Sequence, residues 1–65
     1  MTPLERIVTL LKSAPSEREL AKRLRPIFLN LGRERARRVV REAWDQLQIA
    51  EQAALGAKWR REDMN

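Results

Sequence analysis

Cysteine, histidine and tyrosine are all missing from this chain of 65 residues. The lack of cysteine excludes a disulfide framework and a cysteine-based metal site. The lack of histidine removes the commonest general base and the commonest metal ligand. With glycine only at Gly32 and Gly56, no glycine-rich loop can cradle a phosphate. We therefore expect no enzyme, no cofactor, no metal ion and no small-molecule substrate.

Long hydrophobic stretches are missing as well. The longest uninterrupted apolar runs, such as Ile27 to Leu29, are far too short to span a membrane. The first residues include Glu5 and have no long apolar segment, which is unlike a secretory signal. These features predict a cytoplasmic protein that does not bind a membrane.

Charge of one sign is in excess. The chain has 14 lysines and arginines against 9 acidic residues, which gives a net charge of +5. Such a surplus favours an anionic partner. A chain of this length forms one small domain over residues 1–65, and it buries too little surface to be very stable. It must therefore pack efficiently, self-associate or bind a partner.

Two capping patterns predict where helices begin. Thr2 and Glu5, and again Ser16 and Glu19, have the Ser/Thr-x-x-Glu spacing of a capping box. Behind each cap, apolar residues recur at the spacing of a helical stripe. The first stripe comprises Leu4, Ile7, Val8 and Leu11, and the second comprises Leu20, Leu24, Ile27, Phe28 and Leu31.

Prolines and a glycine predict where these helices end. Pro15 disfavours helical geometry at Ala14 and so ends the first helix. The second stripe runs through Pro26, so we expect a kinked or broken helix over about residues 17 to 30. Gly32 can then take a left-handed cap conformation.

No proline follows Arg33, and one long helix is expected from there to about Arg60. Its small and apolar residues alternate in steps of four and three, as in a heptad seam. The seam comprises Ala36, Val40, Ala43, Leu47, Ala50, Ala54 and Ala57. The fold class is therefore all-α, with two short helices and one long C-terminal helix.

The segment Ser16 to Leu24, S-E-R-E-L-A-K-R-L, precedes an arginine-rich helix. This order resembles helix-turn-helix and winged-helix DNA-binding domains over about residues 4 to 47. Both leucines of the segment match core positions of that family, and Ala21 matches the small residue where its two helices cross. The intervening residues 25–32 exceed the family's usual turn of about 3 or 4 residues. The resemblance implies a helix-turn-helix-like core in a DNA-binding protein, such as a transcription regulator or accessory factor.

Five arginines would face the duplex in this interpretation. They are Arg33, Arg35, Arg37, Arg38 and Arg41. In a plainer interpretation they form a solvated face, because Glu34 and Arg38, Arg38 and Glu42, and Arg41 and Asp45 have the i,i+4 spacing of helical ion pairs. An acidic protein surface is a third candidate partner.

The distal part of the long helix predicts a protein contact. The first two helices, about 15 Å and 20 Å long, are too short to cover it. We expect a second copy, in a homodimer, or a larger protein to cover the residues Leu47, Ala50, Ala54, Leu55 and Trp59. An adaptor or inhibitor that docks this helix on a larger protein is the alternative to the DNA-binding function. Trp44 is expected in the core, and Trp59 in an exposed tail.

Overall fold

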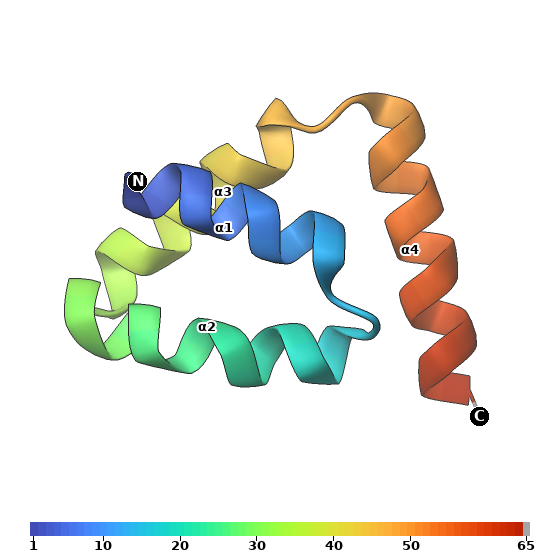
Figure 1. Ribbon diagram of the computed structural model, residues 1–65, viewed down its shortest axis with the longest axis horizontal. Helices are drawn as coiled ribbons and strands as arrows, with labels where there is room; N and C mark the ends of the chain where they lie inside the picture. Colours follow the sequence, from blue (N-terminus) through green and yellow to red (C-terminus); the bar gives the residue numbers. More distant parts are fainter. Residues whose placement is uncertain (65) are drawn as a thin grey trace.

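The computed structural model describes residues 1–64, with side chains as far as Glu62. Four α-helices follow one another: α1 (Pro3–Ser13), α2 (Glu17–Leu31), α3 (Arg33–Gln46) and α4 (Ile49–Met64). Helices α1 and α3 lie side by side, α2 packs against both, and α4 stands across the end of the bundle beside the α1–α2 connection (Figure 1). The all-α class is confirmed for this part of the chain, but the expected number of three helices is wrong.

The first two helices begin where the capping patterns predict. The hydroxyl oxygen of Thr2 accepts a hydrogen bond from the Glu5 backbone N–H at 3.2 Å, and Pro3 occupies the first turn of α1. The hydroxyl oxygen of Ser16 accepts one from the Glu19 N–H at 3.1 Å. Each bond satisfies an N–H that has no partner inside its helix. Both predicted helix starts are confirmed, and of each capping box the bond to the threonine or serine hydroxyl is formed.

Pro26 does not divide α2. The helix continues through it to Leu31, so the break considered from the sequence is not found. Pro26 is exposed, and so is Lys22, whose carbonyl loses its helical partner because proline has no N–H. Water can reach this carbonyl on the outer face, which makes the missing bond tolerable.

A single residue, Gly32, joins α2 to α3. Its N–H donates to the Phe28 carbonyl at 2.9 Å, and its own carbonyl accepts from the Ala36 N–H at 2.9 Å. Its φ of 88° is positive, as expected, but its ψ of 150° lies outside the left-handed helical region. Residues with side chains almost never adopt this combination. Residues 25–31 belong to α2, in agreement with the helix predicted over about residues 17 to 30, and Gly32 alone separates α2 from α3.

The chain leaves the helix at Leu47, where one continuous helix was expected. Leu47 is extended, with φ of −73° and ψ of 146°. Side chains satisfy the backbone groups on both sides of this break. Glu51 Oε1 accepts from the Gln48 N–H at 3.1 Å, and Gln52 Nε2 donates to the Trp44 carbonyl at 2.7 Å. The break lets α4 turn back and pack on the other helices. The prediction of one long helix is therefore wrong, because packing between distant residues outweighs the continuous helical pattern.

One apolar core joins all four helices. Ile7 is fully buried, and no buried polar side chain is found in the described part of the chain. The cluster comprises Ile7, Leu11, Ala14, Leu20, Leu24, Ile27, Ala43, Leu47, Leu55 and Trp59. Ala36 and Ala43 are fully buried on α3, and such small residues allow helices to approach closely. α4 contributes Leu55 and Trp59 to this core, which the expected long helix would have left uncovered.

Candidate binding surface

Helix α3 presents the largest group of exposed cations. All five arginines that were predicted to face DNA are exposed: Arg33, Arg35, Arg37, Arg38 and Arg41. None of them approaches a described carboxylate within 4.0 Å. The ion pairs formed by the described residues are Lys12–Glu51 at 3.7 Å and Glu19–Arg23 at 3.5 Å, and neither involves α3. The three i,i+4 pairs expected along α3 are therefore not formed. These guanidinium groups are left to solvent or to a ligand.

The arginines occupy two sides of α3. Arg37 and Arg41 border an apolar groove beside Val40 and Trp44. Arg35 and Arg38 lie in a second depression with Val39 that also includes Arg41, Glu42 and Asp45. Arg33 stands four residues before Arg37, so it extends the row on the groove side. The cations thus spread around the exposed half of the helix.

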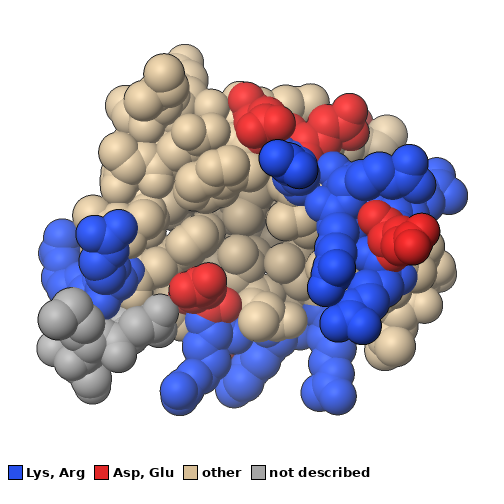
Figure 2. All heavy atoms as spheres, turned by 180° about the vertical axis from the view of Figure 1, so that it is seen from behind, with Lys and Arg blue, Asp and Glu red and all other residues tan. Residues whose placement is uncertain are grey.

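The surplus of positive charge lies mainly on two consecutive helices. Helices α2 and α3, residues 17–46, contain nine basic and five acidic residues. This surplus of four accounts for most of the net charge of +5. Figure 2 shows basic side chains over α3 and along the edge of α2, around a central area without charge. The two helices together make the basic face of the molecule.

The uncharged area is a groove between α2 and α3. It has a volume of about 430 Å³, and Arg37 and Arg41 are the polar members of its lining. Its apolar lining comprises Leu11, Leu20, Phe28, Val40, Trp44 and Trp59. A neighbouring depression continues it along α2 through Ala21, Leu24, Arg25 and Phe28. We call both together the α2–α3 groove.

Trp59 lies in the core rather than in an exposed tail. Only 9% of its surface is exposed, and its indole Nε1 donates to the Ala14 carbonyl at 3.2 Å. Its ring lies 6.0 Å from that of Trp44, at 32° between the ring planes. Trp44 is half-buried against the core, which agrees with its expected place. The exposed Trp59 expected from its basic neighbours is therefore wrong.

The residues that a partner protein was expected to cover fall into two groups. Leu47, Leu55 and Trp59 are buried inside this chain, and their predicted availability is wrong. Ala50 and Ala54 are exposed on α4, as the seam interpretation requires. Self-association was expected because a long helix would lack cover, and the break at Leu47 removes this reason.

The positions that carry the helix-turn-helix resemblance also divide. Leu20 and Leu24 are buried, as core positions of that family would be. Ala21 is exposed and lines the α2–α3 groove, so α3 does not cross α2 at this residue. The groove is open because the alanine has no packing partner there. No sequence pattern pointed to this groove: Phe28 was expected within the core stripe, whereas it is half-buried and lines the groove.

The described residues show neither a metal site nor a membrane-spanning helix. They contain no group of three acidic side chains placed to hold a metal ion. None of the described helices combines the length and apolar character that crossing a bilayer requires. Comparisons with models of protein families, with curated proteins and with solved structures found no match for this chain.

Proposed function

We propose that this protein binds duplex DNA through α3 and acts as a small regulator or accessory factor. The observation that carries the proposal is the set of five exposed arginines on α3, none of which is paired with a described carboxylate. Unpaired cations on one helix can neutralise backbone phosphates and release the counterions that surround DNA.

The shape of α3 suits this role. Its 14 residues make a helix about 21 Å long, and a helix with side chains is about 10–12 Å across. The major groove of B-DNA, about 12 Å wide, admits such a helix. The first turn of α3 has no side-chain cap, so its N–H groups are open to a phosphate oxygen. Arginine in the groove can also bond bidentately to guanine.

The test is binding of a short fluorescent duplex, followed by anisotropy from about 50 mM salt upward. Changing Arg37, Arg38 and Arg41 to Gln removes three cations from α3 and keeps good helix formers. We expect binding to be lost at low salt, or its salt dependence to weaken by about 0.9 in logarithmic slope for each phosphate contact removed.

A matched control removes the same charge elsewhere. Arg6, Arg60 and Arg61 are exposed and lie outside α3, so their joint change to Gln lowers the net charge equally. This variant is expected to bind nearly as well as the natural chain. Equal loss in both variants would mean that net charge alone attracts DNA. No binding by the natural chain at about 50 mM salt would remove the proposal.

The adaptor alternative loses its original basis, because the long docking helix does not exist. With α4 folded back, its apolar residues Leu55 and Trp59 are occupied within the chain. A protein partner would have to use another surface.

A further inference from the structure

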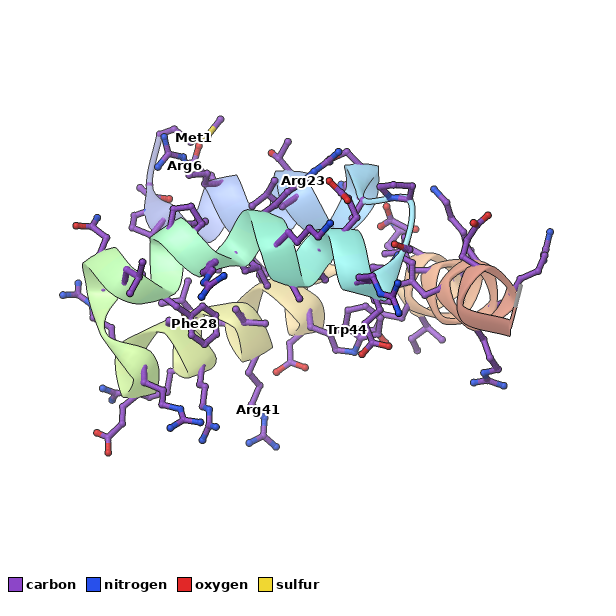
Figure 3. The ribbon with its side chains drawn as sticks, turned by 90° about the horizontal axis from the view of Figure 1, so that it is seen from below. Met1, Arg6, Arg23, Phe28, Arg41 and Trp44 are labelled. Atoms are coloured by element: carbon purple, nitrogen blue, oxygen red, sulfur yellow. The ribbon has the colours of Figure 1, made fainter. Side chains whose placement is uncertain are left out.

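The α2–α3 groove is an apolar surface that the fold leaves uncovered. Phe28, Val40 and Trp44 are only half-buried there, and Ala21 is exposed. Figure 3 shows Phe28 between α2 and α3, and Trp44 where these helices meet α4. Arg41 projects from the same side, whereas Met1 and Arg6 lie on the opposite side of the molecule. The groove thus combines aromatic and aliphatic contacts on one face.

Every charged residue that lines this groove is an arginine. Arg25 stands on the α2 side, and Arg37 and Arg41 stand on the α3 side. An apolar floor between two basic edges is complementary to a helix with an apolar stripe and acidic flanks. Binding of an amphipathic helix in a hydrophobic groove is a common mode of peptide recognition, and opposite charges at the edges orient the partner.

We propose that the α2–α3 groove binds an acidic amphipathic helix of a partner protein. The apolar stripe of that helix would lie on Phe28, Val40 and Trp44. Its carboxylates would meet the guanidinium groups of Arg25, Arg37 and Arg41. This inference goes beyond the proposed DNA binding, with which it shares two arginines.

A second copy of this chain is a poorer occupant. Its exposed large hydrophobic residues are Met1, Leu29 and Ile49 among those described, and they lie on separate segments. None of the four helices, over the described side chains, therefore offers a second stripe of large apolar residues. Helix α4 exposes alanines, and its three basic residues are balanced by three acidic ones, so it lacks the acidic flanks that would match the basic edges of the groove.

A single nucleic-acid strand is the other candidate occupant. Aromatic rings in a basic groove can stack on bases. The groove between the arginines is almost wholly apolar, however, and offers little to bond the polar edges of bases. The observations therefore favour the acidic helix.

The test uses synthetic peptides and the full chain. The probe is a fluorescent helix-forming peptide with leucines at i, i+3, i+4 and i+7 and glutamates between them. A second peptide replaces each glutamate by lysine, and a third has the first composition in scrambled order. We expect the acidic peptide to bind the natural chain at least about tenfold more tightly than either of the others.

Ala21→Glu places a carboxylate in the groove without touching the core or α3. Ala54→Glu is its matched control, because this alanine is exposed on α4. Each new glutamate stands four residues before a basic residue, Arg25 or Lys58, so the two helices gain the same kind of pair. We expect Ala21→Glu to weaken the acidic peptide about tenfold and Ala54→Glu to leave it unchanged. Thermal unfolding of both variants verifies their folds.

Several results would overturn the inference. They are failure of the acidic peptide to bind the natural chain, equal weakening by the two variants, and equal binding of the scrambled peptide. Binding of single-stranded oligothymidylate, but not the acidic peptide, in an Ala21-dependent manner would assign the groove to nucleic acid. Self-association abolished by Ala21→Glu would assign it to a second copy. Binding of duplex DNA is measured separately in the same preparations. The result of that measurement tests the proposed function, and the result with the acidic peptide tests the groove.

Discussion

Helices α1–α3 and helix α4 are held in different ways. The first three share a continuous core in which Ile7 and Ala43 are fully buried. Helix α4 is attached through two buried side chains, Leu55 and Trp59, and through a few polar contacts: the indole hydrogen bond, the bond from Gln52 to the Trp44 carbonyl and the Lys12–Glu51 ion pair. A few anchors therefore decide where α4 lies, whereas many contacts decide the arrangement of the other three. We expect substitutions in the two regions to have different consequences.

The same two regions differ in charge. Helices α2 and α3 have a surplus of four positive charges, whereas residues 47–65 have three basic and three acidic residues. The binding surface proposed for DNA and the groove proposed for an acidic helix both belong to the basic pair. Helix α4 closes one end of the groove through Trp59. Its role in both proposals is to support the surface that the other helices present.

The largest effect is expected from Ile7→Ala. Ile7 has no exposed surface, and truncating such a side chain leaves a cavity that costs about 2–5 kcal/mol. In a domain this small, that loss is most of the free energy of unfolding. Thermal unfolding followed by circular dichroism should show loss of helix in α1–α3 and α4 together. A melting curve like that of the natural chain would show that α1 is not part of the shared core.

A smaller effect, confined to α4, is expected from Trp59→Phe. Phenylalanine keeps much of the buried ring but cannot donate to the Ala14 carbonyl. Leaving that acceptor unpaired costs about 1–3 kcal/mol. Hydrogen exchange should quicken in α4 while α1–α3 stay protected, since regions with few contacts open locally. Uniform quickening along the whole chain would contradict the distinction between the two regions.

The smallest effects are expected from replacing glycine by alanine, which should lower the stability at one position and raise it at another. Gly32→Ala should destabilise the fold by at least about 1 kcal/mol, because residues with side chains rarely adopt its φ of +88°. The added methyl group would meet no other atom, so this backbone strain is the whole expected cost. Gly56→Ala lies inside α4, also in open space, and should stabilise it by about 0.5–1 kcal/mol.

Chemical denaturation of the two glycine variants compares these signs directly. Destabilisation by Gly56→Ala would show that α4 does not remain helical around this residue. A neutral Gly32→Ala would show that the α2–α3 joint does not need its positive φ.

Local sequence determined the starts and ends of the first two helices. Thr2, Ser16 and Gly32 act on their own backbone or on N–H groups within a few residues, so their effects need no distant partner. The same holds for the apolar stripes that bury Ile7, Leu11, Leu20 and Leu24. The all-α class and the exposed arginines of α3 follow from these short-range patterns.

Only the tertiary structure decided the place of α4 and the opening of the groove. Nothing local interrupts the alanine seam at Leu47, and Gln48 is not a usual helix cap. The break is stabilised by Glu51 and Gln52, and it brings Trp59 to a carbonyl 45 residues earlier in the chain. The seam and the stripes predict which residues can be buried on one face of a helix. Contacts between distant segments decided which of these residues are buried, and they also decided that Ala21 is exposed.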